Sequence, residues 1–264
     1  PPIPTCIPNS INCSSSVHVT TANASFPISA VHRTLPILIP TLPDGAAAVL
    51  ACSPVLGAAG DGPPPADAGA ARTPPPRVVN VSPIFDQIVA FSLPADFVVV
   101  HEAGRGQQYI REAVPRGENV RQWTRMVTIT GAKGMATLPG LTPQVFADGI
   151  ASGFQKACPT SFRGTALGAF RIGPHEAFAA VLSCGTSGTE PAPYSESALV
   201  IAIRGEKDVY SLQSAERGPA SAEPLSFNEA YWTERFKQLM PVRLCPVVPG
   251  EAAPYPSCIG AARP

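Results

Sequence analysis

The stretch that decides the fold runs Gly106-Gln-Gln-Tyr-Ile-Arg-Glu-Ala-Val-Pro-Arg-Gly-Glu-Asn-Val-Arg-Gln-Trp-Thr-Arg-Met-Val-Thr-Ile-Thr-Gly131. It contains two aromatic residues, Tyr109 and Trp123, and alternating apolar positions. Residues 108–114 predict a β-strand. Residues 120–127 carry apolar side chains at a spacing of three, four and seven, which predicts a short helix; a strand is the alternative. We interpret this stretch as the structural centre of one α+β domain rather than as an active site.

Further strands and helices are predicted on both sides of this stretch. The strands are expected at 88–93, 97–102, 166–172, 177–184, 197–203 and 209–213. One helix should begin at the N-cap Thr142 and extend to 158, and a second should begin at a capping box, Ser226 to Glu229, and end at 240. Short connections between the strands predict an α+β fold, with a single antiparallel sheet and helices packed on it.

The order of these elements resembles a known family. A Gly117-Glu118 pair and Trp123 follow the strand that contains Tyr109, and further strands and a closing helix come after them. Over residues 84–240 this arrangement resembles the PsbP/Mog1-like domains of bacterial secreted proteins. The resemblance implies a PsbP/Mog1-like sandwich that binds or assembles with other molecules and has no chemistry of its own.

Proline and glycine divide the chain into regions. The 264 residues include 32 Pro and 22 Gly, which crowd the first 76 residues and the last 20 or so, where no core can form at that density. The expected regions are a disordered leader or non-native extension at 1–30, a signal segment at 31–59, a Pro-rich linker at 60–76, an α+β domain at 77–242, and a Pro-rich tail with two cysteines at 243–264.

The segment at 31–59 has the pattern of an export signal. The basic pair His32-Arg33 precedes two apolar runs, 35–40 and 46–52, and small residues follow at 55–59. Each run is shorter than the roughly 20 residues that a membrane-spanning helix requires. Val49-Leu-Ala-Cys52 resembles a bacterial lipoprotein box, so Cys52 is a candidate for lipidation. We therefore expect a periplasmic or extracellular protein. If Cys52 is lipidated, the lipid could anchor the protein to the outer membrane.

Four cysteines fall in the region expected to be mature protein. They are Cys158, Cys184, Cys245 and Cys258, and an even number in an exported chain predicts two disulfides. Three pairings are open. We favour Cys158 with Cys184 and Cys245 with Cys258, which would make the tail a stapled loop.

Charge and motifs exclude several classes of function. Nineteen basic residues balance 19 acidic residues, so no nucleic-acid partner is expected. Because no zinc-type spacing, phosphate loop or Gly-x-Ser-x-Gly elbow occurs, we expect no metal and no cofactor. The candidate ligand-binding residues are Tyr109, Arg111, Trp123 and Arg125, because arginine and aromatic side chains bind anions and carbohydrates well. The alternative is a solvated face balanced by Glu112 and Glu118.

Together these features predict a non-enzymatic exported module that binds or assembles with an unknown protein or small-molecule ligand. One alternative is a secreted hydrolase that uses His101 or His175 with a neighbouring carboxylate, Glu102 or Glu176. The other is an enzyme-inhibiting domain that presents the loop at 185–195.

Overall fold

The structure is a computed structural model, and it describes residues 76–187 and 192–260. The predicted leader and signal segment, nearly all of the predicted linker, and Cys52 lie outside the described residues.

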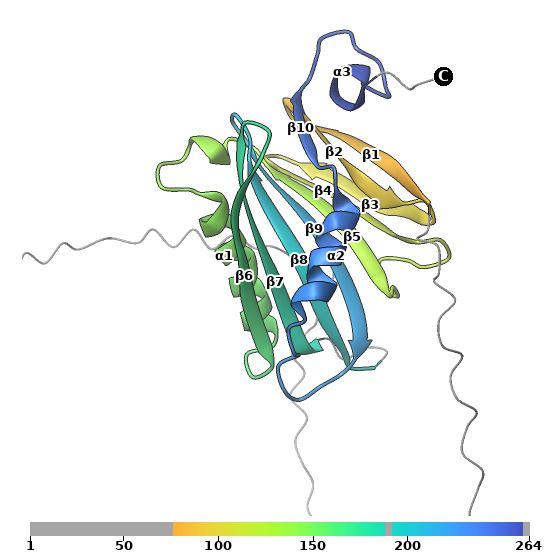
Figure 1. The fold of residues 1–264 in the computed structure, drawn as a ribbon, viewed down its shortest axis with the longest axis vertical. Helices are drawn as coiled ribbons and strands as arrows, with labels where there is room; N and C mark the ends of the chain where they lie inside the picture. The colour runs from red at the N-terminus through yellow and green to blue at the C-terminus, as the bar shows by residue number, and fades with distance from the viewer. Residues whose placement is uncertain (1–75, 188–191, 261–264) are drawn as a thin grey trace, which may run out of the picture. The chain divides into compact units, whose positions relative to one another are not determined.

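The larger of two antiparallel sheets has seven strands in the order β3-β4-β5-β9-β8-β7-β6 (Figure 1). The strands are β3 (Phe97–Arg105), β4 (Gln108–Pro115), β5 (Arg125–Ala132), β6 (Phe162–Ile172), β7 (His175–Ser187), β8 (Tyr194–Arg204) and β9 (Val209–Pro219). The continuous apolar run in β8 predicts a central strand, and residues 198–203 are buried on both faces of the sheet. That prediction is confirmed.

The smaller sheet has three strands, β1 (Arg77–Ile84), β2 (Gln87–Pro94) and β10 (Arg243–Pro246), with β2 in the middle. Leu244 of β10 lies opposite Val89 of β2, and both side chains are buried. The short helix α3 (Pro256–Ile259) follows β10. Tail residues therefore complete a sheet that the beginning of the described chain starts.

The prediction of a single sheet with helices packed on it is wrong, because the described part of the chain is mainly β and forms two sheets. Residues 77–94 form a hairpin that pairs with β10, about 150 residues further along the chain, rather than with the other predicted strands. Period-two patterning shows that a segment is a strand, but it does not show which strand it pairs with.

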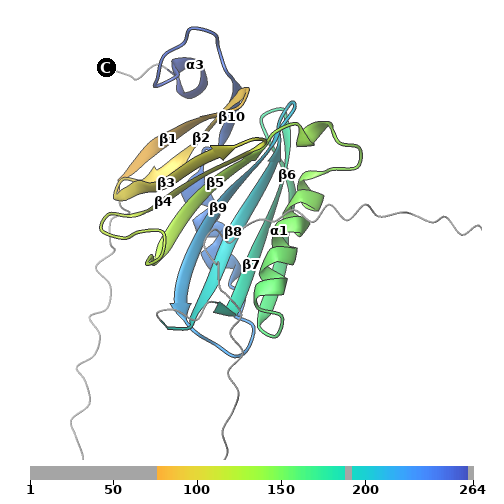
Figure 2. The ribbon, with the colours of Figure 1, turned by 180° about the vertical axis from the view of Figure 1, so that it is seen from behind.

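The two faces of the seven-stranded sheet are covered differently. Helix α1 (Pro143–Ala157) packs on β6, β7 and β8 (Figure 2). Helix α2 (Glu229–Leu239) lies on the opposite face (Figure 1), which the three-stranded sheet also covers. The predicted start of α1 is confirmed, because the Thr142 side chain accepts a hydrogen bond from the Val145 amide at 3.2 Å.

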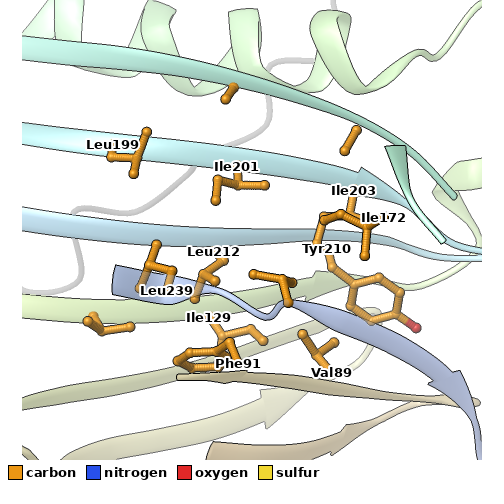
Figure 3. Close-up of a cluster of buried hydrophobic side chains, with 14 of the residues drawn as sticks. Val89, Phe91, Ile129, Ile172, Leu199, Ile201, Ile203, Tyr210, Leu212 and Leu239 are labelled. Atoms are coloured by element: carbon orange, nitrogen blue, oxygen red, sulfur yellow. The ribbon is translucent and has the colours of Figure 1, made fainter. Parts of the chain in front are cut away.

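The larger hydrophobic cluster joins the two sheets. Phe91 and Val89 of β2 lie against Ile129, Leu212 and Ile201 of the seven-stranded sheet (Figure 3). All five side chains are at most 1% exposed. Each contributes roughly 1.5–3 kcal/mol of burial free energy, so this cluster is what holds the sheets together.

Two local predictions are also wrong. Residues 120–124 are not helical, and β5 begins at Arg125, because the β-branched run that follows continues into the sheet. The predicted capping box at Ser226 is not formed. Instead, Asn228 caps α2 by accepting a hydrogen bond from the Tyr231 amide at 3.0 Å, and the helix begins at Glu229.

A buried polar junction fixes the β1–β2 hairpin to the seven-stranded sheet. The Tyr210 hydroxyl lies 3.3 Å from the Ile84 carbonyl oxygen and 3.3 Å from the Asp208 carboxylate. Burial raises the pKa of Tyr210, and the neighbouring Asp208 raises that pKa further. The Gln87 side-chain oxygen accepts a hydrogen bond from the Glu206 amide at 3.0 Å. These bonds fix the relative position of the two sheets at this end.

Candidate functional site

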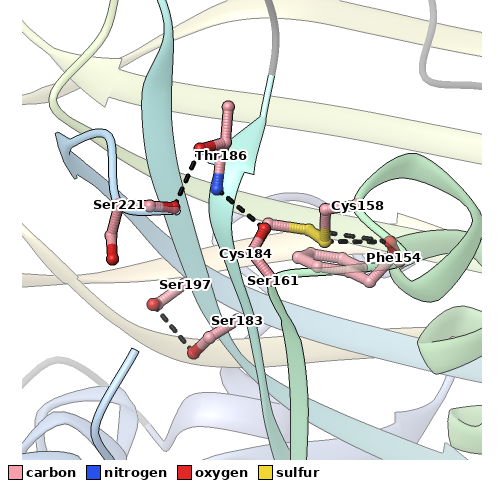
Figure 4. Close-up of a disulfide and its surroundings, with 8 residues drawn as sticks. All are labelled: Phe154, Cys158, Ser161, Ser183, Cys184, Thr186, Ser197 and Ser221. Atoms are coloured by element: carbon pink, nitrogen blue, oxygen red, sulfur yellow. Dashed lines mark hydrogen bonds between the residues drawn. A yellow bond between two sulfur atoms is a disulfide. The ribbon is translucent and has the colours of Figure 1, made fainter. Parts of the chain in front are cut away.

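Two disulfides hold helical segments onto the sheets. Cys158 at the end of α1 is bonded to Cys184 of β7 (Figure 4), and Cys245 of β10 is bonded to Cys258 of α3. This is the pairing favoured by the sequence analysis. Both sulfurs of the first pair are buried, which suits a structural bond better than a catalytic one.

Tyr109 and Arg111 lie together on one face of β4, and both contact Glu102 of β3. The Tyr109 hydroxyl donates to Glu102 at 2.7 Å, and the Arg111 Nε lies 3.4 Å from the same carboxylate. The Arg111 guanidinium also donates to Ser82 at 2.9 Å. Burial and the bond to Glu102 raise the pKa of Tyr109. The two side chains are therefore occupied by partners within the fold.

Trp123 and Arg125 do not join that pair. Trp123 belongs to the cluster on the α1 face of the sheet, whereas Arg111 points toward Ser82 of the three-stranded sheet. Arg125 lies 3.7 Å from Asp96 and 5.3 Å from the ring centroid of Phe97. In the described structure the four candidate side chains do not line one groove, so a common ligand site for them stays a prediction.

Trp123 takes part in a cluster that the sequence analysis missed. The Arg217 guanidinium lies between two rings, 3.8 Å from the centroid of Trp123 and 4.0 Å from that of Tyr194. Its Nε lies 3.5 Å from the carboxylate of Glu196, whose side chain is 21% exposed. The four residues come from the loop before β5, from β8 and from β9, and no spacing in the sequence brings them together.

The pKa of the Glu196 carboxyl group in this cluster is raised. Burial raises the pKa of Glu196 above its ordinary value, Arg217 opposes that rise, and the charge of Glu112 adds to it. A perturbed carboxylate marks a functional or a structural site. Because the neighbouring cation is already stacked and paired, we assign this cluster a structural role: it closes the loop at 116–124 over the ends of β8 and β9.

The two histidines of the hydrolase hypothesis lie far apart. His101 is in β3 and His175 is in β7, and five strand-to-strand steps separate them. At about 4.8 Å a step their strands are roughly 24 Å apart. His101 lies opposite Glu112 in the ladder, and Glu176, beside His175, lies 3.8 Å from Arg204. The two histidines therefore lie on separate parts of the sheet, and the hydrolase hypothesis, which requires only one of them with its own neighbouring carboxylate, stays a prediction.

The loop of the inhibitor hypothesis is only partly described. Strand β7 extends to Ser187 and β8 begins at Tyr194, so much of the predicted loop at 185–195 is strand, while residues 188–191 lie outside the described range. Within residues 76–187 and 192–260, no group of three or more metal-ligating side chains could hold a metal ion. No helix in that same part of the chain is long and apolar enough to cross a membrane.

A surface pocket of about 420 Å³ lies where the first turn of α1 meets the ends of β6 and β7. Its volume falls in the range typical of small-molecule sites, roughly 300–1,000 Å³. The apolar residues that line it are Pro143, Ala169, Phe170, Ala177 and Phe178, and the polar ones are Thr142, Gln144, Arg171 and Glu176. The sequence signals that border it, a helix start and a hairpin turn, carry no sign of a pocket.

Of the two charged side chains that line the pocket, Glu176 has an ion-pair partner among the described residues and Arg171 has none. Glu176 already lies 3.8 Å from Arg204, which also donates to the Ala136 carbonyl at 2.8 Å. Arg171 donates to the Pro174 carbonyl and has no carboxylate partner among the described residues. Arg171 lies directly opposite Glu176 in the β6–β7 ladder, but the Glu176 carboxylate is paired with Arg204, so the Arg171 guanidinium keeps N–H donors for an anion.

Comparison with known proteins places the chain in no family. No family model and no curated protein matches the sequence. Among solved structures it is similar to LpqN of Mycobacterium tuberculosis, a protein involved in cell envelope biogenesis. The identity is 10%, the match covers 64% of this chain and 92% of LpqN, and the TM-score is 0.32. A similarity this distant carries no argument about fold or function, and the PsbP/Mog1-like resemblance is not confirmed.

Proposed function

We propose that this protein is an exported domain that binds a small ligand and catalyses no reaction. The single observation that carries the binding role is the pocket between α1 and the β6–β7 hairpin, whose lining combines apolar and polar residues. Pockets of this composition hold the body of a ligand by burial and orient it with a few polar contacts.

Export is supported by the two disulfides. Disulfides persist in oxidising compartments and are rare in the cytosol, where thiols are kept reduced. A periplasmic or extracellular location, with or without a lipid on Cys52, follows from that chemistry together with the signal pattern at 31–59. Acid quenching of intact cells followed by thiol alkylation should leave Cys158, Cys184, Cys245 and Cys258 unlabelled; labelling of all four would contradict export.

The binding role is tested by filling the pocket. N-phenyl-1-naphthylamine is a neutral dye whose fluorescence rises in apolar surroundings, and we expect the oxidised protein to bind it. Ala169→Trp should abolish that binding because Ala169 lines the pocket. Leu167→Trp is the matched control, since Leu167 lies on the same strand, is 40% exposed and does not line the pocket. Equal dye binding by both variants and the wild type would refute the pocket as a ligand site.

A further inference from the structure

We propose that the ligand of this pocket is a small amphipathic anion, whose apolar body lies on Ala169 and Phe178 and whose negative group meets Arg171. The inference rests on the proposed function, because it names the chemical class that the same pocket would accept. The charged side chains and the apolar side chains that line the pocket both support it.

The sign of the ligand charge follows from which rim groups are already paired. Glu176 is within 3.8 Å of Arg204, so a cationic ligand would have to compete with an internal guanidinium. Arg171 uses one donor on the Pro174 carbonyl and makes no ion pair in the described ranges. A guanidinium offers five N–H donors, which leaves several for a carboxylate, sulfonate or phosphate.

The first turn of α1 adds to this preference. Gln144 lines the pocket and lies in the first turn, where backbone N–H groups lack partners inside the helix. No acidic residue occurs in that turn to offset the positive end of the helix dipole. The helix end alone would define no site, but here it borders the same cavity as the unpaired guanidinium.

The apolar residues that line the pocket on the α1 face determine which apolar group a ligand can place there. Phe178 is 6% exposed and belongs to the core cluster beneath α1. Ala169 lies directly opposite Phe178 in the β6–β7 ladder, so both side chains are on the α1 face of the sheet. The half-buried Phe170 side chain lies on the other face, where it packs edge-on against Phe236 of α2 with ring centroids 5.4 Å apart, and it takes no part in ligand binding. The small Ala169 side chain leaves space beside Phe178 for a flat or branched apolar group.

The test compares two dyes that differ by one sulfonate group. 1-Anilinonaphthalene-8-sulfonate has the ring system of N-phenyl-1-naphthylamine with an added sulfonate. We expect the wild type to bind the sulfonate dye more tightly than the neutral dye. Arg171→Gln should weaken the sulfonate dye roughly tenfold, the loss expected for one charge-assisted hydrogen bond, and leave the neutral dye unchanged. Arg163→Gln, an exposed arginine on the same strand away from the pocket, is the matched control.

The outcomes separate the two proposals. If Ala169→Trp weakens both dyes but Arg171→Gln changes neither, the pocket binds ligands and the anionic class is wrong. If Ala169→Trp changes neither dye, the pocket itself is not a binding site and both proposals fail. Far-ultraviolet circular dichroism of each variant confirms that a lost signal reflects the pocket rather than unfolding. Competition by decanoate, which should displace the sulfonate dye from the wild type only, tests whether a carboxylate is accepted.

Discussion

Arg217 is stacked on Trp123, with its guanidinium carbon 3.8 Å from the centroid of the indole ring, and its Nε is paired with the Glu196 carboxylate at 3.5 Å. The stack joins a loop that lacks regular structure to the ends of two strands. Cation–π contacts of a partly desolvated arginine contribute on the order of 1–2 kcal/mol. This side chain therefore helps to hold the loop at 116–124 closed on the sheet, together with the backbone bonds at Arg116 and Thr124.

Removing the guanidinium should be costly because it leaves a buried carboxylate without its partner. We expect Arg217→Ala to lower the free energy of unfolding by about 2–4 kcal/mol in urea titrations. Adding Glu196→Gln to that variant should restore at least half of the loss, since the uncompensated charge disappears. If the loss of stability in the double variant equals the sum of the losses in the two single variants, the pair is not coupled.

The raised pKa of Glu196 predicts a pH dependence of stability. Above its ordinary pKa of 4.5 the unfolded chain has released this proton while the folded chain still holds it, so unfolding becomes more favourable as the pH rises. Urea titrations from acidic to neutral pH should therefore show Glu196→Gln becoming progressively more stable than the wild type. The opposite trend would mean that attraction by Arg217 outweighs burial.

Tyr231 predicts a second pH dependence at the alkaline end. Burial and the hydrogen bond from its hydroxyl to Glu216 raise the pKa of Tyr231 from 10.0 to about 12. Between these values the folded state holds a proton that the unfolded state has lost, so stability falls as the pH rises through this window. Tyrosinate absorbance should show a component near pH 12 in the wild type that Tyr231→Phe removes. A normal midpoint for that component would refute the assignment.

The disulfide between Cys158 and Cys184 should stabilise the whole domain. It closes a loop with a sequence separation of 26, and loss of such a crosslink costs about 3 kcal/mol in the chain-entropy estimate. We expect the Cys158→Ala/Cys184→Ala double variant to show that loss in thermal or urea unfolding. Removal of the Cys245–Cys258 bond should instead increase amide hydrogen exchange mainly at 243–260. An equal increase across α1 would contradict this division.

The backbone packed around Gly185 leaves no room for a side chain. A Cβ added there would lie 2.3 Å from the Glu223 carbonyl oxygen and 2.6 Å from the Ser221 carbonyl oxygen, both backbone atoms. Gly185→Ala should therefore destabilise the fold by about 2 kcal/mol. Gly149→Ala is the matched control: it lies in α1 with nothing within 4 Å of the added carbon, and it should stabilise the helix by about 0.5–1 kcal/mol. Similar effects of the two substitutions would contradict this difference in packing.

Local signals in the sequence predicted most of the elements but not their assembly. The helix start at Thr142 and the buried run of β8 were predicted because capping and apolar runs act over a few residues. The second sheet was missed because β10 follows a proline and spans only four residues. Its place in the fold depends on Leu244 meeting Val89, a contact across about 150 residues that no local pattern encodes.

The pocket between α1 and the β6–β7 hairpin was not predicted from the sequence. Arg111 and Trp123 are close in the sequence, yet they lie on opposite faces of the sheet, because Arg111 faces the three-stranded sheet whereas the loop that carries Trp123 folds over the α1 face. The pocket residues come from α1, β6 and β7 and have no shared motif. Their proximity depends on the position of α1, which hydrophobic packing sets only once the sheet has formed.

The place of β10 has a consequence for how the molecule matures. Strand β2 is flanked by β1, synthesised just before it, and by β10, synthesised about 150 residues later. In a chain that emerges N-terminus first from a ribosome or a translocation channel, one edge of β2 stays unpaired until residues 243–246 appear. During that interval a chaperone would encounter an apolar strand that the mature protein no longer exposes.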